Sequence, residues 1–434
     1  MSSGLSIRLK FFQLVRESAA IAAAVLKPAL ARHTRIMGLL LRINSRVLAL
    51  PTTVERAAED DNFVKATKDF TGEPGVNLLG YISAESGVGE GARGNIRILQ
   101  SAGIALALNN LDCASRQGDR TYTDFRDMNP FRINLLHVNA DAVRVSLQEK
   151  GIGYLSNKYN IGYWAWELSD FPEIWFDRFQ FFHEIWVPSF FCQDAIARTS
   201  PIPVLRVPHS IEVKEIKDIG RARFGIAEDK FAFLFMFDLF SYLERKNPFA
   251  LIRAFRDAFP REKDVVLVLK CSNMKSGSQE KEALLKEASG LDVKFIDGYL
   301  DRDEIHALIR SCDCYVSLHR SEGFGLPLAE AMCLGKPVIA TGYSGNTDFM
   351  NVNNSLLVKY SLVELEKDIG PYKKGNVWAD PDHGHAVELM RLVYNDRRLC
   401  ERIGKQASAD IKTDLSPGAI GKNVAERLKR LPIW

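Results

Sequence analysis

The sequence predicts an α/β protein of two domains, each built around a parallel β-sheet. Three observations predict this fold class. The chain has 434 residues, which is too long for one hydrophobic core. Short apolar runs alternate with helical or loop segments, a pattern typical of parallel strands joined by crossover helices. The pattern occurs in two successive sets, and residues 208–220 look like the connection between them.

Each predicted strand is a short apolar run bounded by turn residues. In the first set the runs are Gly75–Ile82, Ile104–Leu108, Ile133–Val138, Ile161–Trp166, Ile185–Val187 and Val204–Val207. In the second set they are Phe231–Phe237, Val265–Lys270, Val293–Ile296, Tyr315–Leu318 and Val338–Thr341. Helical patterns cover Ala92–Ala102, Pro248–Phe259, Ala283–Glu287, Asp303–Arg310, Leu328–Leu334, His385–Ala407 and Asn423–Leu431. The domains are therefore expected at 75–212 and 213–405. Residues 406–434 form C-terminal helices that either close the second domain or cross back to the first.

Residues 1–70 are expected to be a basic helical extension followed by a linker. Within residues 1–56, nine basic residues face two acids. Residues 5–50 read as one or two amphipathic helices, with Met37 and Leu41 on one side and Arg42 and Arg46 on the other. Such a helix either lies on an anionic membrane surface or packs on the protein with its basic side in solvent. Ala19–Leu26 also resembles a signal-peptide core, although charged residues abut it.

Composition excludes several functional classes. The net charge is only +3, so no overall attraction to nucleic acid is expected. No apolar run approaches the roughly 18–20 residues that a membrane span needs. The seven cysteines are scattered without metal-ligand spacing, which suggests a reducing compartment and no structural zinc. The expected location is the cytoplasm, on the membrane's cytoplasmic face if residues 1–50 dock there.

The most informative stretch is residues 314–335, which read as strand, glycine-bearing loop and helix. Pro327 suits the first turn of the helix and Gly335 suits its end. Loop amides and a helix N-terminus aimed at one point make an anion site. Glu322 in the loop and Glu330 in the helix are better suited to accept hydrogen bonds from hydroxyl groups. A ligand that carries both phosphate and hydroxyls is implied.

Other candidate residues each allow two interpretations. The glycine-rich stretch 83–91 is either a ligand loop or a plain tight turn. Arg245 and Lys246, at a loop-to-helix junction, either bind a diphosphate or form a solvated basic face. His137, at the carboxyl edge of the first sheet, either contacts a ligand or is a buried histidine bonded to backbone.

These residues together resemble the retaining glycosyltransferases of family 4, which have the two-Rossmann GT-B fold with a cleft between the domains. The main motif is the E-x7-E stretch Glu322–Glu330, with the sequence EGFGLPLAE. Supporting matches are Ser86–Gly89, Arg245–Pro248, Gly335–Ala340 and Gly342–Asn346. The resemblance covers roughly residues 75–430.

The resemblance implies a role for each site residue. Glu322 would accept hydrogen bonds from the donor sugar, and Glu330 would bind the ribose of the nucleotide. Lys246, helped by Arg245, would neutralise the leaving diphosphate. The remaining positions implied as donor-binding are Gly87 and Gly89 in the first domain and Ser241, Tyr299, Gly323, Phe324, Gly325 and Leu326 in the second.

The resemblance also places two residues near parts of the ligand, and the chain departs from the family pattern at one position. His137 would lie near the transferred sugar, and Tyr299 near the base. The family often carries a Gly-Arg pair a few residues before the lysine, where this chain has Phe240-Ser241. Either Arg245 supplies the positive charge of the missing arginine, or Lys246 and the loop amides alone hold the phosphate.

The implied reaction moves a hexose from GDP-mannose or a UDP-sugar to a polysaccharide or lipid-linked oligosaccharide in cell-surface glycan synthesis. It would retain the anomeric configuration and use no metal or cofactor. The alternatives are a nucleotide-sugar epimerase, a sugar-phosphate glycosyl transferase, or a non-catalytic nucleotide-sugar binder on the same fold.

Overall fold

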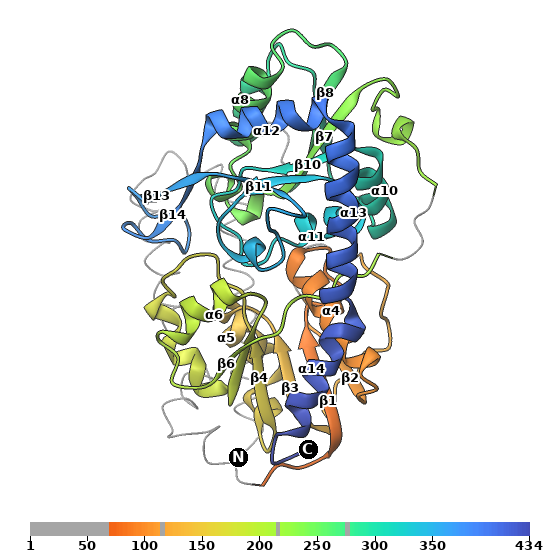
Figure 1. The fold of residues 1–434 in the computed structure, drawn as a ribbon. Coiled ribbons are helices and arrows are strands. Elements are labelled where there is room, and N and C mark those ends of the chain that lie inside the picture. Colours follow the sequence, from red (N-terminus) through yellow and green to blue (C-terminus); the bar gives the residue numbers. More distant parts are fainter. Residues whose placement is uncertain (1–68, 113–117, 214–217, 274–277) are drawn as a thin grey trace, which may run out of the picture. The chain divides into compact units, whose positions relative to one another are not determined.

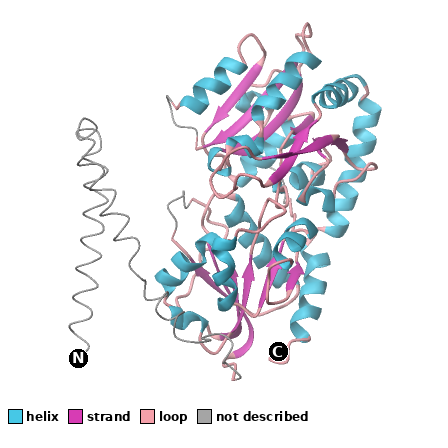
Figure 2. Ribbon diagram, turned by 90° about the vertical axis from the view of Figure 1, so that its left-hand side faces the viewer, coloured by secondary structure: helices cyan, strands magenta, loops and turns pink. Residues whose placement is uncertain are grey.

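The structure is a computed structural model that describes residues 69–112, 118–213, 218–273 and 278–434 (Figure 1). All of these residues belong to one compact unit. The predicted amphipathic helices and membrane-docking segment, residues 1–50, lie outside the described residues. Within the described part, two six-stranded parallel sheets are each covered by helices on both faces (Figure 2). The predicted fold class is confirmed.

The first sheet has the strand order β2-β1-β3-β4-β5-β6. Its strands are β1 (Glu73–Gly80), β2 (Leu106–Asn110), β3 (Phe131–His137), β4 (Tyr159–Tyr163), β5 (Glu184–Val187) and β6 (Val204–Arg206). Its helices are α4 (Gly87–Ser101), α5 (Val143–Lys150) and α6 (Phe190–Ala197). The strand order reverses between β1 and β3, and ligands bind outside the carboxyl ends of parallel strands at such a switch point.

Three asparagines on neighbouring strands form a ladder inside this sheet. Asn77 of β1, Asn134 of β3 and Asn160 of β4 are fully buried. The Asn77 amide donates to Asn134 Oδ1 over 2.9 Å, and the Asn134 amide donates to Asn160 Oδ1 over 2.8 Å. The Asn160 amide in turn donates to the carbonyl oxygen of Leu155. The ladder satisfies these buried amides, which would otherwise be costly, and links three strands.

The second sheet has the strand order β12-β11-β10-β7-β8-β9 and reverses between β7 and β10. Its strands are β7 (Phe231–Asp238), β8 (Val265–Ser272), β9 (Val293–Asp297), β10 (Cys314–Ser317), β11 (Val338–Thr341) and β12 (Leu356–Val358). Its helices are α7 (Leu243–Lys246), α8 (Pro248–Ala258), α9 (Gln279–Glu287), α10 (Arg302–Ser311), α11 (Leu326–Cys333) and α12 (His383–Asn395). A small antiparallel pair, β13 (Tyr360–Glu364) and β14 (Val377–Pro381), follows β12. Short 3-10 turns lie at Ala140–Ala142, Ile152–Leu155, Glu173–Phe181, Arg221–Phe224, Leu239–Ser241 and Gly345–Asp348.

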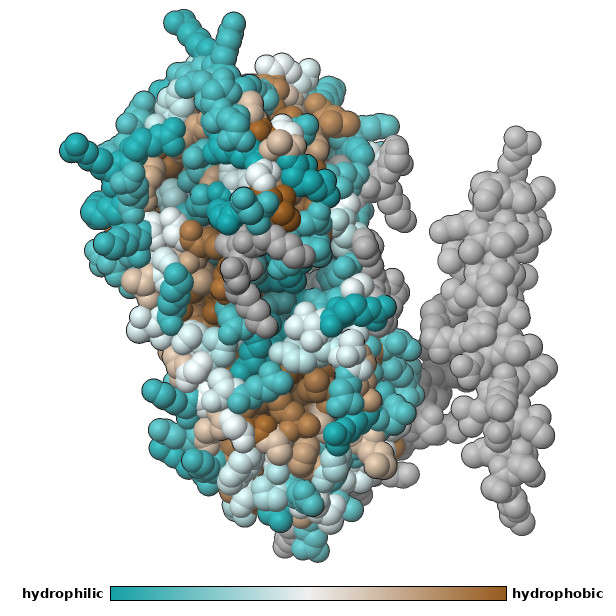
Figure 3. Space-filling view, turned by 90° about the vertical axis from the view of Figure 1, so that its right-hand side faces the viewer, coloured by the Kyte–Doolittle hydropathy of each residue, from teal (hydrophilic) through white to brown (hydrophobic). Residues whose placement is uncertain are grey.

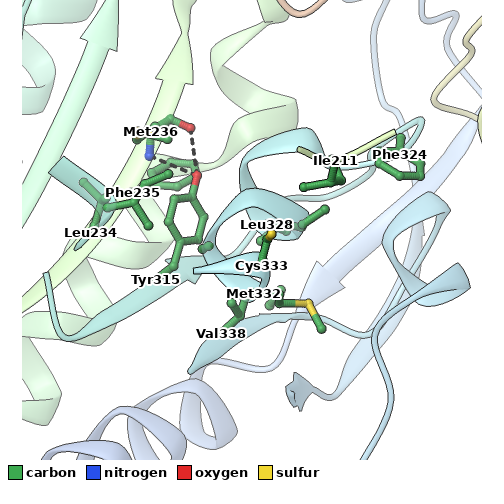
Figure 4. Close-up of a cluster of buried hydrophobic side chains, with 14 of the residues drawn as sticks. Ile211, Leu234, Phe235, Met236, Tyr315, Phe324, Leu328, Met332, Cys333 and Val338 are labelled. Atoms are coloured by element: carbon green, nitrogen blue, oxygen red, sulfur yellow. Dashed lines mark hydrogen bonds between the residues drawn. The ribbon is translucent and has the colours of Figure 1, made fainter. Parts of the chain in front are cut away.

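Helix α11 is held on the second sheet by a continuous apolar core. Figure 4 shows Leu328, Met332 and Cys333 of α11 packed near Tyr315 of β10. The Tyr315 hydroxyl accepts a hydrogen bond from the Met236 amide over 3.2 Å, which ties β10 to β7 at the switch point. This packing holds α11 against the second sheet.

The predicted helix His385–Ala407 is wrong as a single element, because it divides into α12 and α13 (Arg397–Asp414). Asp396 leaves the helical region, with φ −117° and ψ 87°, and its side chain caps α13 by accepting from the Leu399 amide. The last helix, α14 (Pro417–Lys429), packs on α4 of the first domain (Figure 1). There the Ser101 hydroxyl donates to the Pro417 carbonyl over 2.8 Å.

The surface drawn in Figure 3 carries apolar side chains in separate groups on both domains, with hydrophilic side chains between them. Scattered groups of this kind are ordinary on folded proteins and mark no particular docking face. Among the described residues, no helix has both the length and the apolar character needed to cross a bilayer.

Candidate functional site

The candidate site is a cavity of about 780 Å³ between the two domains. Its walls include the loops that follow β1 and β3 in the first sheet and β7 and β10 in the second, together with residues at or after the carboxyl ends of β4, β6, β8 and β9. The cavity therefore lies at the carboxyl ends of both sheets and includes both switch points, where α/β sheets bind ligands.

The loop before α11 offers free backbone donors to this cavity. Gly325 has φ +94°, a conformation that favours glycine, and it turns the chain into the helix. In the described part of the chain, the amides of Phe324, Gly325 and Leu326 donate to no protein acceptor, and all three residues line the cavity. Free amides at a helix N-terminus suit a phosphate.

The same loop is fastened on its far side by residues 344–345. The Gly345 amide donates to the Glu322 carbonyl over 2.9 Å, and the Glu322 amide donates to the Ser344 hydroxyl over 2.8 Å. A Cβ on Gly345 would lie 2.2 Å from the Gly323 carbonyl oxygen, so only glycine permits this approach. The loop is therefore held rigidly with its free amides toward the cavity.

Glu322 forms a buried ion pair with two cations. Lys246 Nζ contacts Glu322 Oε1, and Arg245 lies 3.4 Å from Oε2. Burial alone would raise the pKa of Glu322, but Lys246 and Arg245 outweigh it and lower that pKa to about 2. Burial lowers the pKa of Lys246, and Glu322 partly offsets this. The carboxylate is therefore ionised and the lysine is held at the cavity wall.

An Asn-Pro pair places Arg245 and Lys246 at the end of the short helix α7. Asn247 takes φ +56°, ends α7 and allows Pro248 to start α8. The Asn247 side-chain amide donates to the Leu318 carbonyl over 3.0 Å, and the Arg320 backbone amide donates to the Arg245 carbonyl over 2.8 Å. These bonds bring the loops after β7 and β10 together. Ser241 also lines the cavity here.

Glu330 is paired with Arg302, a residue that the sequence interpretation missed. Arg302 NH2 lies 2.6 Å from Glu330 Oε1, while its Nε lies 3.7 Å from Glu90 Oε2 in the first domain. Glu90 also contacts Arg93 and Arg97. Burial would raise the pKa of Glu90, but Arg302, Arg97 and Arg93 lower it to about 2. Arg302 thus joins carboxylates of both domains beside the cavity.

Two sequence signals could have found this group. Asp301 and Glu304 form a capping box, which places Arg302 at the start of α10 with the cavity-lining Tyr299 just before it. Glu90 lies inside the glycine-rich stretch already singled out. Tyr299 donates its hydroxyl hydrogen to Asn273 Oδ1 over 2.8 Å.

The glycine-rich stretch of the first domain was expected to be a loop through residue 91. This is wrong for Gly87 and Gly89, which lie in the first turn of α4. Ser86 caps the helix by accepting from the Gly89 amide, which compensates for the poor helix propensity of glycine. Gly87 lines the cavity. Gly89 is buried behind the wall, where a Cβ would lie 2.2 Å from the Ala84 carbonyl oxygen. Gly89 therefore serves close packing of α4.

His137 lies at the end of β3 on the first-domain wall, as the sequence predicts. Its ring stacks on Tyr163, with centroids 4.3 Å apart, and His209 lies beside both rings. Sequence interpretation missed His209, which follows β6 and carries no motif. The His209 ring contacts Phe324 of the motif loop edge-on.

Direct contacts join the first domain to the motif loop. The Ser189 hydroxyl donates to the Gly323 carbonyl over 2.6 Å, and the Cys192 thiol donates to the same oxygen over 3.2 Å. Tyr372 of the second domain donates to Glu167 Oε2 over 3.2 Å. The cavity therefore depends on both domains being in contact.

We expect the free energy of unfolding to fall as the pH drops from 6.5 to 4. Burial lowers the pKa of His209, and separately of His319, from 6.5 to about 4. Between these values the unfolded chain takes up protons and the native protein does not. Each histidine therefore lowers the free energy of unfolding by about 1.4 kcal/mol per pH unit. The contribution of Glu90 and Glu322 is lost only below their unfolded pKa of 4.5.

Urea unfolding of the wild type and of His209→Phe at pH 7, 6 and 5 measures this dependence. From pH 7 to pH 5 the free energy of unfolding should fall less steeply in the variant than in the wild type. The difference between the two slopes should equal the contribution of one histidine. Equal slopes in the two proteins would contradict the prediction.

Comparisons with known proteins agree with this architecture. Residues 217–410 match the family model described as glycosyl transferases group 1. Anabaena HepE, solved with UDP and glucose, has a TM-score of 0.60 at 16% identity over 83% of this chain and 100% of its own. Sucrose-phosphate synthase from Thermosynechococcus elongatus has a TM-score of 0.61 at 16% identity over 83% and 99%.

A glycosyltransferase from Rickettsia africae has a TM-score of 0.58 at 11% identity over 84% of this chain and 100% of its own. At these identities the likeness concerns the fold, and the family match covers the second domain. The chain therefore has the two-domain GT-B fold, with a second domain similar to the glycosyl transferases group 1.

Proposed function

We propose that the protein is a retaining, metal-independent glycosyltransferase of family 4. It moves a hexose from a nucleotide-diphosphate sugar to a polysaccharide or lipid-linked oligosaccharide in cell-surface glycan synthesis. The observation that carries the proposal is the convergence on one cavity of free amides before α11, the buried Lys246 and the paired carboxylate Glu322.

In this proposal the donor's diphosphate binds the amides of Phe324, Gly325 and Leu326. Lys246 and Arg245 neutralise the negative charge that develops as the diphosphate leaves. Glu322 and Glu330 accept hydrogen bonds from the donor's hydroxyl groups, those of the sugar and of the ribose respectively. The cations and the helix N-terminus supply the charge that a metal ion would otherwise provide.

The reaction proposed is a front-face displacement. The acceptor hydroxyl oxygen forms a bond to the anomeric carbon while the bond from that carbon to the phosphate oxygen breaks. The acceptor's proton passes to the leaving phosphate oxygen, so atoms and charges balance without a covalent enzyme intermediate. The new linkage keeps the anomeric configuration of the donor.

The donor is expected among UDP- and GDP-linked hexoses. HepE was solved with UDP and glucose and also with UDP-glucose, which makes UDP-glucose the first donor to test. A thermal-shift series should include UDP-glucose, GDP-mannose, UDP and GDP, because a ligand that binds only the native state raises the melting temperature. No shift with any nucleotide sugar would contradict the proposal.

Product analysis tests the reaction itself. With an α-linked donor, NMR of the product should show an α linkage, and EDTA should leave turnover unchanged. A β linkage would exclude retention, and loss of turnover in EDTA would exclude metal independence. Donor incubated without acceptor should show no C2 epimer, which separates transfer from epimerisation.

A further inference from the structure

Most of the buried cations that line the cavity are already neutralised by carboxylates of the protein. Lys246 and Arg245 share Glu322, and Arg245 NH2 also lies 3.8 Å from Glu167 Oε1. These two cations and two carboxylates together carry no net charge. Arg245 is also buried and donates to the Ser321 carbonyl over 2.8 Å, so its guanidinium is held within the protein. A nucleotide diphosphate is a polyanion, and this group alone offers it no net positive charge.

The arginines near Glu330 are paired as well. Arg302 contacts Glu330 and Glu90. Arg93 contacts Glu90 and Asp119. These two arginines therefore bring no spare positive charge to a ligand either.

Lys270, near the carboxyl end of β8, is a buried cation of the same cavity that has no carboxylate in contact. Its side chain lines the cavity, and the residue is only 6% exposed. Among the residues that the structure describes, its ammonium donates to Ser272 Oγ and forms no ion pair. Burial lowers the pKa of Lys270, and carboxylates at a greater distance, such as Asp238 and Glu85, offset this only in part. An ammonium has three donors, so Lys270 keeps both donors and a poorly compensated charge for a ligand.

The sheet places Lys270 between two parts of the proposed nucleotide site. In the strand order, β8 lies between β7 and β9. The chain after β7 leads to Lys246, and the chain after β9 leads to Tyr299, which the resemblance places near the base. Lys270 is aligned with Met236 of β7, which also lines the cavity. Between its β-phosphate and its base a nucleotide carries the α-phosphate and the ribose, and of these two only the α-phosphate is an anion.

We propose that Lys270 binds the α-phosphate of the nucleotide and supplies the positive charge of the arginine that this chain lacks at Phe240-Ser241. This rests on the proposed function, since it assumes that a nucleotide sugar places its diphosphate on the amides before α11. The diphosphate is then held by cations from two neighbouring strands, Lys246 after β7 and Lys270 on β8. A nucleoside without phosphate gains nothing from Lys270.

A series of ligands that differ only in phosphate tests the proposal. Isothermal titration calorimetry, with displacement of UDP for the weak ligands, gives Kd values for uridine, UMP and UDP. Lys270→Met should weaken UMP and UDP by about ten- to a hundredfold each, because a charged hydrogen bond to the phosphate is lost. The Kd of uridine should stay the same. If the protein selects guanine, guanosine, GMP and GDP replace the uridine series.

The stability of the unliganded protein gives a second measurement. Lys270→Met replaces a buried charge that has no close counter-ion with an apolar side chain of similar length. The melting temperature without ligand should therefore stay the same or rise, while the rise caused by UDP becomes smaller. A lysine that served only to hold the fold together would show the reverse, a lower melting temperature and unchanged Kd ratios.

Lys158 of the first domain provides a matched control. It is similarly buried, at 8% exposed, and its Nζ donates to the Thr71 carbonyl over 2.9 Å, but it does not line the cavity. Lys158→Met should leave the Kd values of uridine, UMP and UDP unchanged.

Two results would overturn the inference while leaving the proposed function intact. One is a Lys270→Met protein that loses the same factor for uridine as for UMP, which would place the lysine against the nucleoside. The other is a Lys270→Met protein with an unchanged Kd for UMP. A wild type that binds no nucleotide of either series would overturn the proposed function, and this inference with it.

Discussion

Replacing Lys246 with methionine is expected to lower kcat for glycosyl transfer about a hundred- to thousandfold. The lysine is held in the cavity wall by Glu322, beside the free amides of the α11 N-terminus. Removing one preorganised donor from a charge that develops in the transition state has an effect of this size. KM should change much less than kcat, because the charge is largest in the transition state. Steady-state kinetics with the donor found by thermal shift measures both constants.

The controls separate catalysis from folding. Lys230→Met removes a surface lysine paired with Asp292, away from the cavity, and should leave kcat unchanged. In Lys246→Met the Glu322 carboxylate keeps Arg245 at 3.4 Å, so the variant should remain folded, which circular dichroism checks. A Lys246→Met enzyme that keeps more than about a third of wild-type kcat would refute the role of the lysine.

Replacing Arg302 with methionine is expected to lower the free energy of unfolding by about 2–3 kcal/mol and to weaken nucleotide binding. The change leaves the buried Glu330 carboxylate without its cation at 2.6 Å and removes the link to Glu90 of the first domain. Breaking one side of a buried ion pair costs more than the pair itself contributes. Arg302 is partly exposed, which reduces the cost below that of a fully buried pair. Urea unfolding and titration with UDP measure the two effects.

A nearby arginine makes the matched comparison. Arg223 pairs with Glu304 on the same helix α10, but it is well exposed, so Arg223→Met should cost less than about 1 kcal/mol. Arg302→Met combined with Glu330→Gln should recover stability, because no unpaired carboxylate remains. Similar losses for Arg302→Met and Arg223→Met would show that the link between domains adds nothing.

The sequence was informative where function depends on local pattern. The apolar runs predicted every described strand of the two sheets except β12, and residues 314–335 predicted a strand, loop and helix that the structure contains. These features can be predicted from neighbouring residues alone, because hydrophobic periodicity and a turn that requires glycine are local properties of the sequence. The start of α4 shows the limit, because one capping serine outweighed the glycines that suggested a loop.

Contacts made across the cavity could not be predicted in this way. Arg302 meets Glu90 although the two residues are far apart in sequence and lie in different domains. His209 meets His137 although β4 and β5 separate their strands, because the segment after β6 brings His209 against Tyr163 at the end of β4, and Tyr163 also stacks on His137. The first of these pairings depends on how the two sheets are placed and the second on how one sheet is ordered, and no single motif encodes either.

The asparagine ladder of the first sheet has a consequence for exchanging segments between proteins of this fold. Asn77 is aligned with Asn134 in the same register that aligns Gly80 with His137. A slip of one residue would break the ladder and move His137 by about 3.3 Å along the strand. A segment carrying β3 from another protein of this fold would leave the buried Asn160 Oδ1 of β4 without its donor, and Asn77 with one acceptor fewer, unless it brought its own asparagine. Domain exchange in this protein should therefore move the three strands as one cassette.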